Sequence, residues 1–148
     1  MRHVPPPLWA LLLLAASYGL SHLPGLNAAP MLPTRPAGVV VIAAGLTLIF
    51  WAMLQFRLAN TQLLPNSPVN RSLVTSGVFG LTRNPMYLGM VLFCVGGALW
   101  MERAVMLLAP VLMFGVANWV FIPFEEGKMR RQFGEAFDAY ARRVRRWL

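Results

Sequence analysis

Four long apolar runs separated by short polar segments dominate the first 124 residues of the chain. A helix needs about 20 mostly apolar residues to cross the hydrocarbon core of a membrane, and three of the four runs approach that length. The pattern therefore predicts an all-α, integral-membrane bundle of about four transmembrane helices, forming one domain over residues 1–148. The predicted spans are 8–26, 37–56, 86–101 and 104–124.

The pattern changes after Glu126. Apolar residues now recur every three or four positions among arginine, glutamine and acidic residues, which predicts an amphipathic helix on the cytoplasmic side over 125–148. Two interpretations stay open: an anchor lying in the lipid headgroups, or a lid packed over the mouth of the bundle. The apolar positions are Met129, Phe133, Phe137, Tyr140, Val144 and Trp147.

Short sequence signals between and within the runs predict how the helices pack. Glu102 and Arg103 separate the last two runs, so we expect a tight turn and two antiparallel neighbours. Pro110 predicts a kink in the fourth helix. Three glycines on the third helix allow a neighbouring helix to approach closely; they are Gly89, Gly96 and Gly97.

The composition agrees with a membrane protein. Hydrophobic residues make up 57% of the chain and charged residues 12%, whereas about a quarter of the residues in a soluble domain are charged. The net charge is +8, but seven of the thirteen Lys and Arg lie in the last 21 residues rather than along a stripe. This distribution favours a tail facing lipid headgroups and gives no support to nucleic-acid binding.

The basic residues also predict an orientation. If successive spans cross the membrane in alternating directions, eleven of the thirteen basic residues fall on one side and only Arg35 and Arg103 on the other. The positive-inside rule assigns the side with eleven to the cytoplasm and the side with two to the outside. We therefore expect a multi-pass protein of the cell (inner) membrane with both termini in the cytoplasm. Residues 8–16 also resemble a signal peptide after Arg2, but no clear cleavage site follows and the run continues to Leu26.

Cysteine and histidine give no sign of a metal site or a disulfide. Cys94 is the single cysteine and lies inside an apolar run, while His3 and His22 are isolated. No Ser-His-Asp or Cys-His arrangement is visible either. The chain uses twelve Arg and one Lys, which is typical of a GC-rich genome and favours a bacterial-type protein.

Two polar clusters flank the predicted third and fourth helices. Arg83 and Asn84 precede the third helix, Tyr87 lies one turn inside it, and Glu125 and Glu126 follow the fourth. Ionisable residues near the membrane core are costly, so they are candidates for a functional site. Because the two helices are predicted to be antiparallel neighbours, we expect the clusters to converge.

The converging groups suit one kind of ligand. A helix N-terminus and Arg83 favour a carboxylate, and the glutamates accept from an ammonium or from ribose hydroxyls. Phe79 and Tyr87 offer faces for a purine, while Gly77 and Gly80 let the backbone come close. S-adenosylmethionine carries all four groups and is the predicted cofactor.

Structural interpretations of the same residues stay open. Arg83 is also explained as a positive-inside anchor, and Tyr87 as a residue of the interfacial aromatic belt. Glu125 and Glu126 are also explained as partners of arginines on the tail helix, one turn further on; these are Arg130 and Arg131.

Two sequence blocks carry a family resemblance. LVTSGVFGLTRNPMYLG (73–89) resembles the Arg-(His/Asn)-Pro-x-Tyr-x-Gly element of the isoprenylcysteine carboxyl methyltransferases, which are related to the membrane phospholipid N-methyltransferases. FEEGKMRRQFGEAFDAYARRVRRWL (124–148) is similar to their Glu-Glu-x-x-Leu element, with Met129 at the leucine position. The resemblance covers the C-terminal half of the chain.

The resemblance implies an integral-membrane enzyme that uses S-adenosylmethionine, a cofactor pocket closed by the C-terminal segment, and a lipophilic small-molecule substrate that enters between helices. The residues to which it assigns cofactor binding, including two supporting residues, are Arg71, Ser72, Leu73, Val74, Phe79, Arg83, Asn84, Pro85, Met86, Tyr87, Glu125 and Glu126.

The chain departs from the family pattern at two positions. Asn84 stands where histidine is common and does not titrate. Phe121 stands four residues before Glu125, where the prenylcysteine branch has an arginine for the substrate carboxylate. The resemblance therefore supports the cofactor more than a particular acceptor, which is left as a carboxylate, amine or thiol of a lipid or isoprenoid-like compound.

Other functions remain as alternatives. One is an NADPH-dependent enzyme like the membrane sterol reductases, and another is a small non-catalytic membrane protein that keeps the motifs for structure. The sequence identifies neither a general base nor the oligomeric state.

Overall fold

The computed structural model describes residues 4–26, 33–59 and 72–148, and these contain helices and turns but no strand. In chain order the elements are α1 (Pro6–Leu20), α2 (Arg35–Leu58), the 3-10 turn η1 (Gly77–Gly80), α3 (Pro85–Met101), the 3-10 turn η2 (Ala104–Leu107), α4 (Leu108–Val116), the π-helical η3 (Ala117–Phe121), α5 (Ile122–Phe133) and α6 (Glu135–Arg143).

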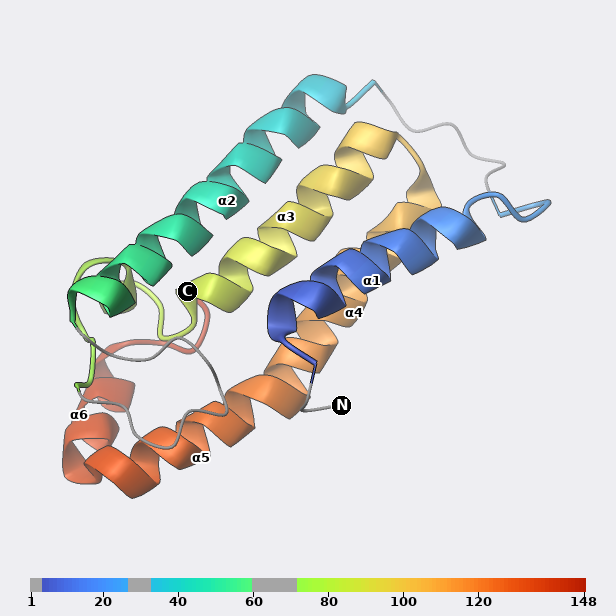
Figure 1. Cartoon of the computed structure of the whole chain (residues 1–148). Helices are drawn as coiled ribbons and strands as arrows, with labels where there is room; N and C mark the ends of the chain where they lie inside the picture. The colour runs from blue at the N-terminus through green and yellow to red at the C-terminus, as the bar shows by residue number, and fades with distance from the viewer. Residues whose placement is uncertain (1–3, 27–32, 60–71) are drawn as a thin grey trace.

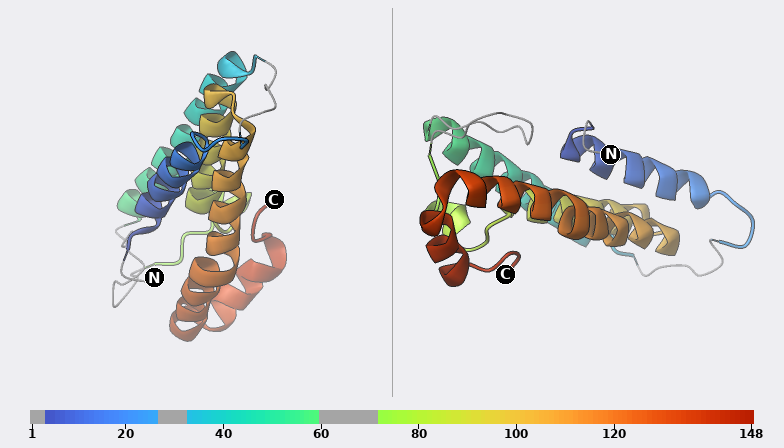
Figure 2. Two further views of the ribbon diagram at one scale, coloured as in Figure 1. Left: turned by 90° about the vertical axis from the view of Figure 1, so that its right-hand side faces the viewer. Right: turned by 90° about the horizontal axis from the view of Figure 1, so that it is seen from below.

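The helices form a bundle, and α5 and α6 extend it at the end where α2 ends and α3 begins (Figure 1). α2 and α3 lie side by side and antiparallel, while α1 packs on α3 and α4. α4, η3 and α5 form one continuous helical rod, and α6 follows it at the end of the bundle where α2 ends (Figure 2). The end of the bundle where α3 begins therefore gathers segments that are far apart in the sequence.

Two helices are long and apolar enough to cross a membrane. They are Arg35–Leu58 and the rod Ala104–Phe133. The first and third predicted spans form shorter apolar helices, Pro6–Leu20 and Pro85–Met101, so four spans remain a prediction. The first span was predicted to reach Leu26, but the helix ends at Leu20. A series of turns follows it and includes Gly25, which has a φ of 84°.

The predicted end of the fourth helix at residue 124 is wrong. The rod continues to Phe133 and ends only at Gly134, whose φ of 51° lies in the left-handed region that favours glycine. The amphipathic segment 125–148 is therefore not one helix: its first part belongs to the rod, α6 follows Gly134, and residues 144–148 are not helical. The charged residues from Glu125 onward mark the end of the apolar run, but the helix itself continues to Phe133.

The irregularity of the rod lies at η3. Pro123 has no N–H for the helix ladder, and its ring crowds the preceding turn. The π-helical turn Ala117–Phe121 ends two residues before it, within the turn that the proline ring would crowd. Pro110, where the sequence predicted a kink, lies in the first turn of α4, a position that accepts proline.

A glycine seam joins α2 and α3 backbone to backbone. A Cβ atom built on Gly45 would lie 2.7 Å from the carbonyl oxygen of Gly89 and 2.8 Å from the amide nitrogen of Phe93. Glycines at these positions thus set how closely the two helices approach. The residues that meet are Gly38 and Gly45 on α2, and Gly89 and Gly96 on α3. The close approach predicted for Gly89 and Gly96 is confirmed, whereas Gly97 faces Leu14 of α1.

The turn between α3 and the rod closes the end of the bundle away from α6. Glu102 adopts a left-handed conformation with a φ of 54°, and its carboxylate accepts the backbone N–H of Thr34 at 3.1 Å. The Thr34 hydroxyl donates to the carbonyl of Leu99 at 2.7 Å. The predicted tight turn and antiparallel pairing of α3 and α4 are confirmed.

The glycine seam yields a stability prediction. Gly45→Ala should destabilise the protein by about 1–3 kcal/mol, because the new methyl group meets backbone atoms that cannot rotate away. Thermal unfolding in detergent, followed by tryptophan fluorescence, measures the change. Gly19→Ala on α1 is the matched control, since nothing lies within 4 Å of its added methyl group. Equal melting temperatures for the two variants would contradict the seam.

Candidate functional site

Two adjoining cavities lie at the end of the bundle where α3 begins. The larger has a volume of about 300 Å³ and the smaller about 80 Å³. They share part of their walls, so a ligand in one touches the border of the other. The shared residues are Phe56, Phe79, Arg83, Asn84, Glu125 and Met129.

The larger cavity is mainly apolar. Residues 5–7 before and at the start of α1, side chains of α2 and α3, and Met129 of α5 form most of its wall. Its ionisable residues are Arg83, Tyr87, Glu125 and Lys128. Such a wall suits a hydrocarbon group with a polar group at one end.

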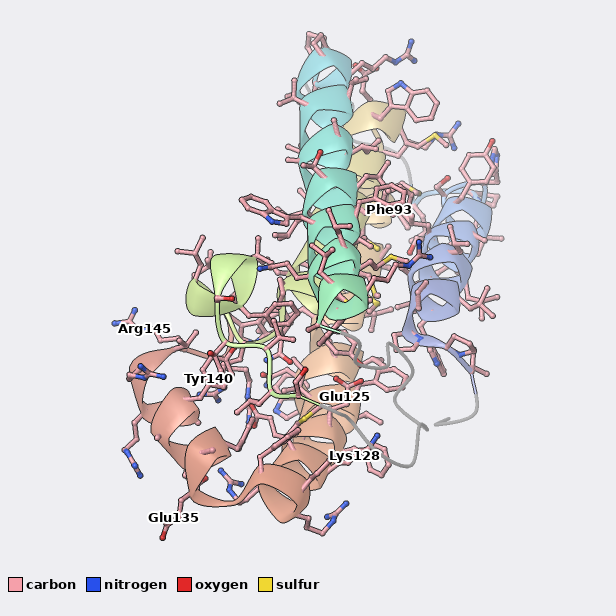
Figure 3. All side chains as sticks on the ribbon, turned by 60° about the vertical axis from the view of Figure 1, so that its left-hand side comes forward. Phe93, Glu125, Lys128, Glu135, Tyr140 and Arg145 are labelled. Carbon is pink, nitrogen blue, oxygen red and sulfur yellow. The ribbon has the colours of Figure 1, made fainter. Side chains whose placement is uncertain are left out.

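The smaller cavity is lined by the motif residues and covered by α6. Residues 72–74, Phe79 and Glu126 form its walls, and Phe137 and Tyr140 of α6 close it. Figure 3 shows Tyr140 directed from α6 toward the interior, whereas Glu135 points outward. The apolar side of α6 thus packs against the site, as the second of the two interpretations predicts, and we call α6 with residues 144–148 the lid.

Tyr87 and Glu125 join α3 to α5 at the boundary of the two cavities. The Tyr87 hydroxyl donates to Glu125 Oε1 at 2.7 Å. The Tyr87 ring stacks on Phe121, with 6.1 Å between ring centroids and 19° between planes. Because Phe121 and Glu125 are four residues apart on one face of the rod, the aromatic contact also orients the carboxylate.

An ion triplet lies beside this pair. Arg83 Nη2 contacts Glu126 Oε1 at 2.8 Å, and Arg146 Nη2 contacts Glu126 Oε2 at 2.7 Å. The Arg83 and Glu126 side chains are 14% and 13% exposed, so this pair is largely withdrawn from solvent. Arg83 Nη1 also donates to the carbonyls of Ala141 and Val144 at 2.7 and 2.8 Å. Every nitrogen of the Arg83 guanidinium is engaged within the protein, so Arg83 supports the site.

The residues after α6 pair with the segment before α3. The backbone N–H of Arg83 donates to the carbonyl of Arg145 at 2.9 Å. The carbonyl of Arg146 accepts from the Thr82 hydroxyl at 3.1 Å and from Asn84 Nδ2 at 3.0 Å. These bonds fasten residues 144–148 across the start of α3.

Two further hydrogen bonds hold the lid. The Tyr140 hydroxyl donates to the carbonyl of Phe79 at 2.7 Å. Burial raises the pKa of Tyr140 to about 12, so its hydroxyl keeps the donated proton at neutral pH. Trp147 Nε1 donates to Asn118 Oδ1 at 3.0 Å, within the π-helical turn.

The predicted site residues lie together around the cavities. Residues 72–74 and Glu126 line the smaller cavity; Pro85, Met86 and Tyr87 line the larger; Phe79, Arg83, Asn84 and Glu125 line both. Arg71 lies outside the described residues. The structure therefore brings the two polar clusters together, as their placement on antiparallel helices predicted.

The structure contradicts two of the structural interpretations that the sequence left open, those for Glu126 and Tyr87. Glu126 pairs with Arg83 and Arg146, whereas Arg130 pairs with Asp138 at 2.8 Å, so the predicted pairing of Glu126 with Arg130 or Arg131 is wrong. Tyr87 is buried, which removes it from an interfacial belt.

Sequence reasoning missed Arg146 and Asn118. Arg146 belongs to a run of arginines, and nothing in that run distinguishes it. Asn118 did carry a signal, because it is the one amide side chain in the apolar run 104–124, and a polar residue in a predicted span is a candidate for function.

The fold and site are those of a helical membrane-type protein with a lidded, two-part cavity, and the comparisons identify its family. A family model described as phospholipid methyltransferase matches residues 34–136. The chain belongs to this family.

Individual relatives are similar to about half of the chain. Protein-S-isoprenylcysteine O-methyltransferase B of Arabidopsis thaliana is 36% identical over 81 residues, covering 51% of this chain and 38% of the plant protein. A probable protein-S-isoprenylcysteine O-methyltransferase of Oryza sativa subsp. indica is 36% identical over 78 residues, covering 49% and 38%. An uncharacterized protein of Haemophilus influenzae is 32% identical over 63 residues, covering 43% of this chain and 100% of that protein.

These matches confirm the resemblance to the isoprenylcysteine methyltransferases. The chain covers 38% of the length of the two plant relatives. No solved structure matches it.

The ion triplet yields a second prediction. Glu126→Gln should destabilise the lid by about 3 kcal/mol, because two arginines lose their shared carboxylate. Limited trypsin digestion should then release the C-terminal segment faster than in the wild type. Asp138→Asn, which breaks an exposed pair with Arg130 and keeps every trypsin site, is the control and should leave the digestion rate unchanged. Wild-type digestion of Glu126→Gln would show that the triplet does not hold the lid.

Proposed function

We propose that the protein is an S-adenosylmethionine-dependent methyltransferase that acts on a lipophilic acceptor at the cytoplasmic face of the membrane. The observation that carries the proposal is the meeting of a motif-lined cavity with an apolar cavity at Glu125. Membership of the phospholipid methyltransferase family and the names of the plant relatives support it.

The chemistry of the shared wall fits the cofactor. Glu125 is a carboxylate for an ammonium or ribose hydroxyls, and Phe79 offers a ring face beside it. Ligand cavities are commonly 300 Å³ or larger, so the smaller cavity of about 80 Å³ holds only part of a nucleoside. We infer that the cofactor occupies the border of both cavities, and that the lid yields space when it binds.

The larger cavity suits the acceptor. Its apolar walls accommodate a hydrocarbon group, and its polar end lies at Tyr87 and Glu125. Phe121 occupies the position of the arginine found in the prenylcysteine branch; it is buried and stacked on Tyr87. The acceptor is thus not held by a cation at that position. The accepting atom belongs to a carboxylate, amine or thiol.

The residues act by holding and enclosing the reactants. When bound, S-adenosylmethionine supplies an electrophilic methyl group, so the protein need not supply a nucleophile. Tyr87 and Glu125 orient the polar groups at the boundary of the cavities, which confines the acceptor to a productive approach. The lid of Phe137 and Tyr140 excludes water from the smaller cavity.

Binding of S-adenosylhomocysteine tests the proposal. Calorimetric titration into the detergent-purified protein should show saturable binding to the wild type. Glu125→Gln should weaken it about tenfold or more, since it removes a charge-assisted hydrogen bond from the ligand. Tyr87→Phe keeps the ring stack and should weaken it less. Glu135→Gln, on the exposed side of α6, is the matched control.

The outcomes separate the competing functions. No binding to a well-folded wild type would overturn the methyltransferase proposal, and a titration with NADPH would then distinguish a reductase from a non-catalytic protein. Unchanged affinity in Glu125→Gln with intact wild-type binding would reject the assigned role of Glu125 and leave the cofactor in place.

A further inference from the structure

The lid and the end of α5 carry a set of exposed arginines. Its members lie at the end of α5, in α6 and in the segment after it. Among the described residues, none of them has a carboxylate within ion-pairing distance. We call this cluster the basic patch; it consists of Arg131, Arg142, Arg143 and Arg145.

The apolar side of α6 is turned away from the patch. Phe137 and Tyr140 are each 3% exposed and pack against the site. Figure 3 shows Arg145 on the outer side, pointing away from Tyr140. Because α6 buries its apolar residues in the protein, any attachment of its outer side to a membrane must rely on charge.

The position of the patch indicates its partner. α2 exposes a band of large apolar side chains, namely Phe50, Trp51, Leu54 and Leu58, which suits contact with lipid chains. Arg57 is exposed at the C-terminal end of this helix, and α6 lies at the same end of the bundle (Figures 1 and 2). Lipid headgroups around α2 would therefore lie at the level of α6.

We propose that the basic patch binds anionic lipid headgroups and thereby holds the C-terminal segment closed over the candidate site. The guanidinium group matches phosphate oxygens in a bidentate geometry. Each arginine near an anionic membrane surface strengthens attachment by about fivefold. Four such side chains with no competing carboxylate make a headgroup surface the matching partner.

The contacts of the C-terminal segment couple the patch to the site. Arg145 exposes its side chain while its carbonyl accepts from the backbone N–H of Arg83 at 2.9 Å. The next residue, Arg146, turns inward to Glu126. Ala141, which directly precedes Arg142, is also bonded to Arg83, because its carbonyl accepts a hydrogen bond from Arg83 Nη1. Headgroups that hold the patch therefore hold the same stretch of backbone that fastens across the start of α3.

Amide hydrogen exchange in lipid nanodiscs tests this inference without any cofactor, so its outcome is independent of the proposed methyltransferase function. The full chain is placed in bilayers of phosphatidylcholine, or of phosphatidylcholine with a third replaced by phosphatidylglycerol. Exchange at residues 141–148 should be about tenfold slower in the anionic bilayer at low salt, and high salt should remove most of the difference.

Two variants complete the test. Arg142→Gln, Arg143→Gln and Arg145→Gln combined should lose the difference between the bilayers. Arg35→Gln, at the opposite end of α2, should keep it. Equal exchange of the wild type in both bilayers would overturn the inference, as would a triple variant that still distinguishes them. Slower exchange of the wild type that is lost in the triple variant and kept in Arg35→Gln would establish it.

Discussion

The ion triplet of Arg83, Glu126 and Arg146 is the interaction on which the site depends. A carboxylate withdrawn from solvent is stable only when an opposite charge or a hydrogen-bond donor contacts it. Glu126 has two such partners, Arg83 and Arg146, which lie 43 and 20 positions away in the sequence. This requirement draws the start of α3, the rod and the C-terminal segment to one point. The lid over the smaller cavity follows, because α6 is the link between the rod and the segment that Arg146 fastens.

The glycine seam complements the triplet at the level of whole helices. Where α2 and α3 meet backbone to backbone, no side chain separates them and little space is left for a ligand. Beyond Gly45 and Gly89, toward the start of α3, larger side chains such as Ile49, Met53 and Phe56 replace glycine on α2, and the larger cavity occurs there. The larger cavity thus lies at the end of the seam, where α2 presents larger side chains to α3.

The arrangement separates two kinds of chemistry that the proposed function has to combine. Polar and charged groups gather on the side covered by α6, and apolar walls face α1 and α2. Tyr87 and Glu125 stand where the two regions meet. The departures from the family pattern also divide along this line: Asn84 keeps its hydrogen-bonding ability and lies among the polar groups, whereas Phe121 joins the aromatic stack beside the apolar cavity.

The sequence by itself determined the all-helical class, the turn at Glu102, most of the predicted residues around the cavities and, of the four predicted spans, two that form helices long enough to cross a membrane, because hydrophobic period and motif spacing are local properties. Only the tertiary structure decided where the rod ends, since the change from apolar to charged residues predicted a helix end near residue 124, whereas the helix continues to Phe133. It also decided the partners of Glu126. All seven basic residues of the tail look alike in the sequence, and only the return of the segment after α6 to the start of α3 turns Arg146 inward and leaves Arg145 outside.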